Sequence, residues 1–198
     1  MLCLAWRIAG AVRRLSQFPE SETMRHILPA ALASVFVISA AHAEEQTISV
    51  PREGWRIRFN APRLTPTENE VPGVFTGIAG RFQLSFFVER PRCPGPDTDE
   101  NIYNCFAALL KKNPTVLWDT ESGNKSRNGV HVAYMAELKT DKGVGRAFNL
   151  NLLFAHGGKW ADVHLSFASP TKEDVPVIFD IADSIVVEDE PDASSGAN

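Results

Sequence analysis

The sequence has no surplus of positive charge. Its 198 residues include 20 Lys and Arg against 24 Asp and Glu, which gives a net charge of −4. Proteins that bind nucleic acids by neutralising phosphates usually carry a basic surplus or a basic stripe along one face. Because neither is present, we expect no nucleic-acid partner.

The sequence also has no hydrophobic run long enough to cross a bilayer, which takes about 20 apolar residues. Its most apolar stretch, from Ile27 to Ala40, follows Met24-Arg25-His26 and precedes small residues that end at Ala43. A positive start, a short apolar stretch and small residues are typical of a secretory signal peptide, with a buried core helix as the alternative. We therefore predict export to the periplasm, cleavage after Ala43 and no stable membrane anchor.

These features divide the chain into four parts. Residues 24–43 are the predicted signal peptide, and residues 1–23 are interpreted as an upstream extension that results from a mis-called start. Residues 44–189 are numerous enough to bury a core of their own, which predicts a single α+β domain. Residues 190–198 are acidic and small, which predicts a disordered tail.

Cysteine is scarce, with three in the chain. Cys3 lies in the predicted extension, so Cys93 and Cys105 would remain after export. A pair of cysteines in an oxidising compartment favours a disulfide, and the alternatives are two free thiols or half of a metal site. Their spacing resembles neither a zinc knuckle nor a CxxC redox pair. We predict a structural disulfide between the Pro-rich loop from Arg92 to Pro96 and the helix that follows it.

Alternating apolar residues predict an antiparallel sheet accompanied by two helices. The expected strands lie at 55–60, 74–89 with an interruption near Gly77 and Gly80, 116–118, 131–139, 146–155 and 160–168. Asp97 with Glu100 predicts the start of one helix, and Thr171 with Asp174 predicts the start of a second. The expected fold class is therefore α+β, an antiparallel β-sheet meander with a helix after the first strands and a C-terminal helix packed on one side.

The order of these elements resembles the PsbP/Mog-like fold family, which includes DcrB-like bacterial envelope proteins. The matching features are the opening strand motif from Gly54 to Pro62, the helix after Phe82–Glu89, and the closing helix that runs into Ser184-Ile185. The resemblance covers nearly all of the chain after Ala43, but the cysteine pair is not part of the family pattern. It implies a non-catalytic assembly, binding or accessory protein.

Three residues could form a metal or catalytic site. His131, Asp162 and His164 alternate with apolar residues, and they would converge if their strands were neighbours. Two imidazoles and a carboxylate are enough to hold a metal ion. The alternative is that they are ordinary polar residues on the outer face of a sheet, which is the interpretation given to Asn149 and Asn151.

A second candidate is the hairpin that contains His156 and Trp160, which could contact a ligand or could be a plain polar turn. The His156-Gly157-Gly158 sequence has no G-x-S-x-G nucleophile elbow to accompany it, so it does not predict a hydrolase. We expect neither a cofactor nor catalytic residues.

The sequence therefore predicts a non-enzymatic exported protein that engages a protein partner or a small ligand, for example in envelope assembly or toxin immunity. The alternative is a metal-dependent enzyme or metal-binding protein that uses the cluster of His131, Asp162 and His164.

Overall fold

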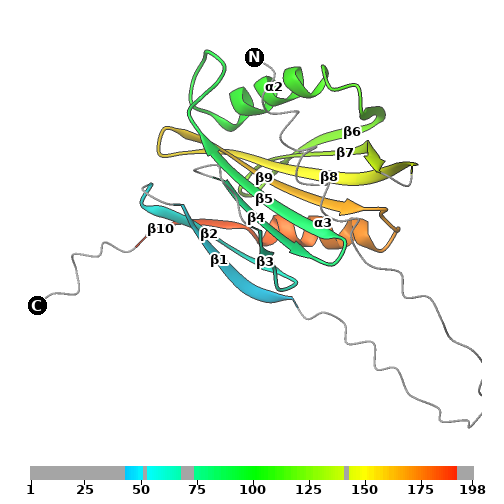
Figure 1. Ribbon diagram of the computed structural model, residues 1–198. Coiled ribbons are helices and arrows are strands. Elements are labelled where there is room, and N and C mark those ends of the chain that lie inside the picture. The colour runs from blue at the N-terminus through cyan, green and yellow to red at the C-terminus, as the bar shows by residue number, and fades with distance from the viewer. Residues whose placement is uncertain (1–42, 51–52, 68–73, 141–142, 191–198) are drawn as a thin grey trace, which may run out of the picture.

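The computed structural model describes residues 43–50, 53–67, 74–140 and 143–190, which form two antiparallel sheets and two helices (Figure 1). The smaller sheet has the order β1-β2-β10, with β1 at Glu44–Val50, β2 at Trp55–Ala61 and β10 at Val186–Asp189. The larger sheet has the order β3-β4-β5-β9-β8-β7-β6, and its strands are β3 (Thr65–Pro66), β4 (Val74–Ala79), β5 (Phe82–Glu89), β6 (Val116–Ser126), β7 (Gly129–Thr140), β8 (Gly143–His156) and β9 (Lys159–Ala168). The helices are α2 (Asp99–Leu110) and α3 (Asp174–Ser184). The expected α+β class, with a helix after the early strands and a C-terminal helix, is confirmed.

The main hydrophobic core lies between the two sheets. Leu84 of β5, Leu165 of β9 and Leu150 of β8 stand side by side on the larger sheet, and each is 0% exposed. Ile57 of β2 and Ile178 of α3 belong to the same core cluster. Burial of a side chain of this kind contributes about 1.5–3 kcal/mol. This core therefore holds the smaller sheet and α3 against one face of the larger sheet.

The opposite face of the larger sheet carries α2. Ile102 and Leu110 of this helix pack in a second core cluster with Leu153 of β8 and Trp160 of β9. Figure 1 shows α2 and α3 on opposite faces of the larger sheet, which corrects the expectation that they pack on one side. The reason is that the central strands are buried on both faces: the adjacent residues Leu152 and Leu153 are 0% and 1% exposed.

The loop before α2 is held by a disulfide. Cys93 and Cys105 are bonded, with their Cα atoms 6.0 Å apart, which confirms the predicted pairing. The helix cap differs from the expectation, because Thr98 and not Asp97 is the N-terminal cap. Its side-chain oxygen accepts a hydrogen bond from the backbone N–H of Asn101 at 3.3 Å. Asp97 is thereby left free to contact the sheet.

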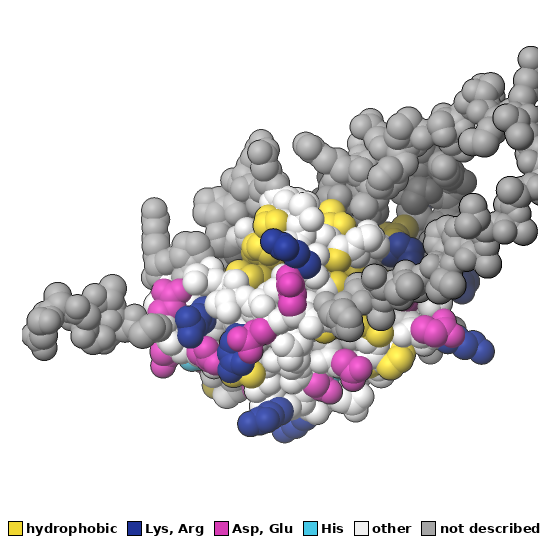
Figure 2. Space-filling model, turned by 90° about the horizontal axis from the view of Figure 1, so that it is seen from below, with side chains coloured by type: hydrophobic (Ala, Val, Ile, Leu, Met, Phe, Trp, Pro, Cys, Tyr) yellow, Lys and Arg dark blue, Asp and Glu magenta, His cyan; other side chains and the backbone are white. Residues whose placement is uncertain are grey.

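The outer face of the smaller sheet is covered by ion pairs. Glu188 contacts Arg56 at 3.2 Å and Arg58 at 2.7 Å, and Arg58 also contacts Glu45 at 2.7 Å. Figure 2 views this side and shows basic and acidic side chains interspersed on it. Exposed ion pairs of this kind contribute little to stability, and the mixture of signs is typical of an ordinary solvated surface.

Neither helix within the described ranges is long and apolar enough to cross a bilayer. Residues 1–42 and 191–198 lie outside the described residues. The predicted extension therefore lies outside them, as do nearly all of the predicted signal peptide and of the predicted tail.

Candidate functional site

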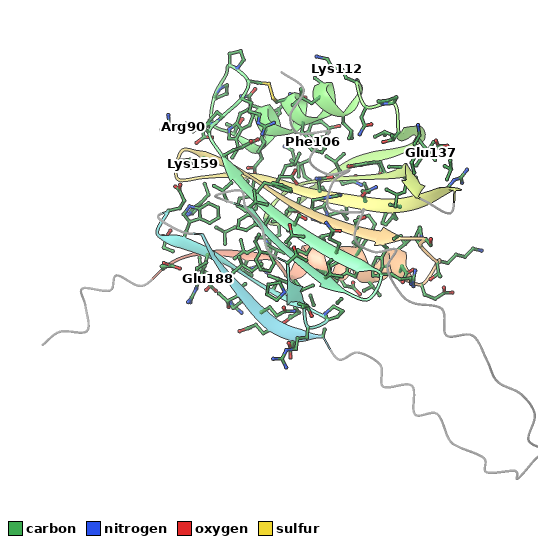
Figure 3. All side chains as sticks on the ribbon, in the orientation of Figure 1. Arg90, Phe106, Lys112, Glu137, Lys159 and Glu188 are labelled. Carbon is green, nitrogen blue, oxygen red and sulfur yellow. A yellow bond between two sulfur atoms is a disulfide. The ribbon has the colours of Figure 1, made fainter. Side chains whose placement is uncertain are left out.

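A small cleft lies between α2 and the larger sheet, and we call it the α2 cleft. Its apolar walls are formed by Ile102, Phe106 and Leu109 of α2 and by Leu153, Trp160 and Ala161 of the sheet. Figure 3 shows Phe106 below α2, on the side of the helix that faces the sheet. The cavity has a volume of about 30 Å³, which is room for one or two water-sized groups.

The α2 cleft forms because polar contacts fix the start of the helix to the β8–β9 hairpin. The indole Nε1–H of Trp160 donates to Asp97 Oδ1 at 3.0 Å, and the backbone N–H of Ala155 donates to Asp99 Oδ1 at 3.0 Å. The disulfide at Cys105 then holds the preceding loop beside the helix. One end of the helix is thus anchored on the sheet, while Leu109 near the other end is 45% exposed.

Asp162 supplies the main polar group of the α2 cleft. The amide Nδ2 of Asn151 donates to Asp162 Oδ1 at 2.7 Å, and this is the only hydrogen bond to that carboxyl from the residues the structure describes. Burial raises the pKa of Asp162 to about 7. The bond from Asn151 and the charge of Arg92 counter part of this increase, whereas the charge of Glu89 adds to it.

The rim of the α2 cleft carries a second carboxyl group, that of Glu89 at the end of β5. It forms an ion pair with Arg92, which lies next to the disulfide-bonded Cys93. Burial raises the pKa of Glu89, and the nearby charge of Arg92 counteracts this. The carboxylate of Glu89 at the rim is therefore paired with a basic side chain. Asp162 inside the cleft has no basic side chain bonded to it among the described residues.

Asn151 links the α2 cleft to a row of buried polar side chains on the same face of the sheet. Asn151 is 1% exposed, and its Oδ1 has no hydrogen-bond partner within the described part of the chain. His164, two residues after Asp162, shares a 3.0 Å hydrogen bond between its Nε2 and Asn149 Oδ1. Burial lowers the pKa of His164 to about 4, so its imidazole is neutral at pH 7. The row is a structural polar network, and Asp162 is its member that opens into the cavity.

His131 does not join Asp162 and His164. The strand register places His131 opposite Leu152, which in turn lies opposite Val163, so His131 faces α3 and the main core. Its Nε2 is 3.7 Å from Asp183 Oδ1, and burial lowers the pKa of His131 while that carboxylate raises it. Within the described residues no three His, Cys, Asp or Glu side chains are grouped to hold a metal ion.

His156 and Trp160, the two residues proposed as a ligand-contacting hairpin, lie in different environments. Trp160 is 2% exposed and lines the α2 cleft. The ring of His156 instead packs on Trp55, with the ring centroids 5.0 Å apart, and its Nε2 lies 3.3 Å from Asp189 Oδ1. Only Trp160 therefore belongs to the candidate site.

Sequence reasoning missed Glu89 and Arg92, and it assigned Asn151 no role. No local signal in the sequence points to the cleft, because its lining residues come from α2 and from the separate strands β5, β8 and β9. No family model matches this sequence, and none of the curated proteins compared with it is similar enough to count as a relative.

Proposed function

We propose that this chain is an exported, non-enzymatic binding or accessory protein and that the α2 cleft is its binding site. The signal-peptide pattern that ends at Ala43 supports export to the periplasm. The bond between Cys93 and Cys105 supports an oxidising compartment. The resemblance to PsbP/Mog-like proteins supports a binding or accessory role over a catalytic one.

The observation that carries the proposed binding site is the incomplete pairing of Asp162. A carboxyl group buried beneath apolar walls is destabilising unless it is neutralised or fully hydrogen-bonded. Among the described residues Asp162 accepts one hydrogen bond, from Asn151, and its side chain lines the cavity. Buried polar groups that lack partners are common at functional sites. A ligand group that enters the α2 cleft would complete the pairing.

The size of the α2 cleft limits what enters it. A cavity of about 30 Å³ holds one small functional group, while the rest of the bound molecule would lie over Phe106 and the exposed Leu109. The occupant is therefore a small ligand, or a single side chain of a partner, with a polar end and an apolar body.

Export is tested on protein expressed from the full-length sequence in a bacterial host. We expect a periplasmic product that begins at Glu44, by intact mass, and that has no thiol free to react with a maleimide. An unprocessed cytoplasmic product with free thiols would contradict export.

Binding is tested by two-dimensional NMR of the same product with a mixture of neutral, anionic and cationic fragments. The indole N–H of Trp160 is the reporter, because this residue lines the α2 cleft. We expect fragments to shift this signal and the signals of Phe106 and Leu109. If every hit shifts residues elsewhere, or if no fragment binds, the α2 cleft is not the binding site.

A further inference from the structure

We propose that the α2 cleft recognises a primary ammonium group on an apolar chain, with the Asp162 carboxylate as its counter-ion. This inference rests on the proposed binding function and specifies the chemical class of the ligand. It follows from three properties of the α2 cleft, namely which polar atoms lack partners, how large the cavity is, and what forms its walls.

The atoms that lack partners are acceptors. Asp162 lines the α2 cleft and has one carboxylate oxygen without a hydrogen bond from the described residues. The Oδ1 of its partner Asn151 lacks a hydrogen bond from them too, but it is buried and does not line the cleft. A missing partner must therefore be a donor. A primary ammonium has three N–H donors, a hydroxyl has one, and a carboxylate has none. The open carboxylate oxygen of Asp162 favours the ammonium, because an ammonium supplies both a donor and the opposite charge.

The charged and titratable groups that surround Asp162 compensate its charge only in part. Among the described residues, Arg92 is the one basic side chain that lines the α2 cleft, and its guanidinium pairs with Glu89 at the rim. The charge of Arg92 lowers the pKa of Asp162 but does not outweigh the effect of burial. Tyr134 of β7 has a pKa raised by burial and by the charge of Asp162, and His164 of β9 is neutral, so neither supplies a positive charge. The side chains that α2 contributes to the cleft are uncharged. A cation from outside the chain would therefore meet a carboxylate to which no basic side chain of the described residues is bonded.

The size of the cavity selects among cations. About 30 Å³ accommodates an –NH₃⁺ group, which is close to water in size. A planar guanidinium with three nitrogens or a trimethylammonium is several times larger than a water molecule and would require α2 to move. The apolar walls at Ile102 and Phe106, and Leu109 at the mouth, fit the methylene stem that carries the ammonium.

The ammonium could belong to a free alkylamine or to a lysine side chain of a partner, because both present the same group on an apolar stem. Two probes distinguish these sources: n-hexylammonium, and a lysine blocked at both ends as its N-acetyl methylamide. Tighter binding of the alkylamine indicates a free amine, and tighter binding of the blocked lysine indicates a peptide.

The test is an NMR titration at pH 8 that follows the indole signal of Trp160. The protein is titrated with n-hexylammonium, with the blocked lysine, with 1-hexanol as the uncharged match, and with tetramethylammonium. Asp162→Asn removes the charge and keeps the oxygen that accepts from Asn151. Asp180→Asn removes an exposed carboxylate on α3 and is the matched control.

We expect hexylammonium or the blocked lysine to bind at least tenfold more tightly than 1-hexanol and tetramethylammonium, because a charge-assisted hydrogen bond is lost with either control ligand. Asp162→Asn should weaken ammonium binding about tenfold or more, and Asp180→Asn should leave it unchanged. If 1-hexanol binds as tightly as hexylammonium, or if Asp162→Asn has no effect, the ammonium inference is wrong while the α2 cleft remains a binding site. If none of the four ligands shifts Trp160, the ammonium inference is wrong; if the fragment mixture does not shift it either, the proposed binding site fails as well.

Discussion

Replacing Asp162 with Asn should stabilise the protein at alkaline pH and much less at acid pH. The carboxyl lies beneath α2, and within the described part of the chain it accepts a single hydrogen bond, from Asn151. Burial raises its pKa to about 7, from 3.8 for an exposed aspartate. Asn has nearly the same shape and keeps the oxygen that accepts from Asn151. The substitution therefore removes the charge with little other change.

The sign of the effect follows from the two pKa values. Because the folded-state pKa of Asp162 is the higher one, its contribution to stability is fully present below about pH 4. That contribution decreases as the pH rises from 4 to 7, since the unfolded chain releases the proton while the folded chain retains it. Asn does not titrate, so the free energy of unfolding of the variant relative to the parent should rise over the same interval.

The magnitude follows from 1.36 kcal/mol per pKa unit. Between pH 5 and pH 8 the expected change in the stability difference is about 2–3 kcal/mol. We expect a value near the lower end of this range, because the Asp162 side chain is partly open to the cavity, where water offsets some of the free-energy cost of burying the charge.

Urea unfolding at pH 5 and pH 8, at one ionic strength, measures this difference. Asp180→Asn is the control and should show the same stability relative to the parent at both pH values. If the stability difference for Asp162→Asn is equal at pH 5 and pH 8, the carboxyl is not buried as described and the reasoning is wrong.

Three further predictions concern the disulfide, the buried polar row and the start of β7. Cys93→Ser combined with Cys105→Ser should lower the free energy of unfolding by about 3 kcal/mol, since the bond closes a short loop; an unchanged urea midpoint would contradict this. The His164 imidazole should remain neutral from pH 8 to pH 5, because burial lowers its pKa to about 4, and an NMR midpoint above pH 6 would refute that. Gly129→Ala should destabilise by about 2 kcal/mol or more, because Gly129 has φ +143° and a Cβ there would lie 2.3 Å from a β8 carbonyl oxygen. Gly145→Ala, whose nearest contact would be 3.9 Å, should change the urea midpoint far less.

The strands were the most predictable part of the fold. Regular alternation of apolar residues correctly indicated β5, β7, β8 and β9, and Thr171 with Asp174 indicated the helix α3. The short strands β3 and β10 were missed, because two and four residues carry no readable alternation. The strand β1 was also missed, since it begins with Glu44-Glu45 and has few apolar side chains.

The face on which each side chain lies could not be predicted. His131 is 5% exposed and its neighbour Val132 is 0% exposed, because both faces of β7 are covered. From the sequence alone, the polar residues of an alternating strand are expected to lie on a solvent-exposed face. That expectation fails here, because α2 covers one face of the sheet and α3 covers the other. His131 was therefore grouped with Asp162, which points to the opposite side of the sheet.

The candidate site was predicted only in fragments. Trp160 and Asp162 were singled out, but each was assigned a partner that lies elsewhere. Glu89 joins them because β5 pairs with β9, with Glu89 opposite Trp160 and Phe87 opposite Asp162. These strands are separated in the sequence by α2 and three other strands, and no local pattern reveals that they are neighbours.

The most direct test of the central claim is the pKa of the Asp162 carboxyl, measured by ¹³C NMR in the presence and absence of n-hexylammonium. The account predicts a midpoint near pH 7 for the free protein, and a decrease of at least one pH unit when the ammonium binds, because a bound cation favours the ionised carboxylate. A midpoint near 4 in the free protein, or a midpoint that the ammonium does not move, would contradict the account.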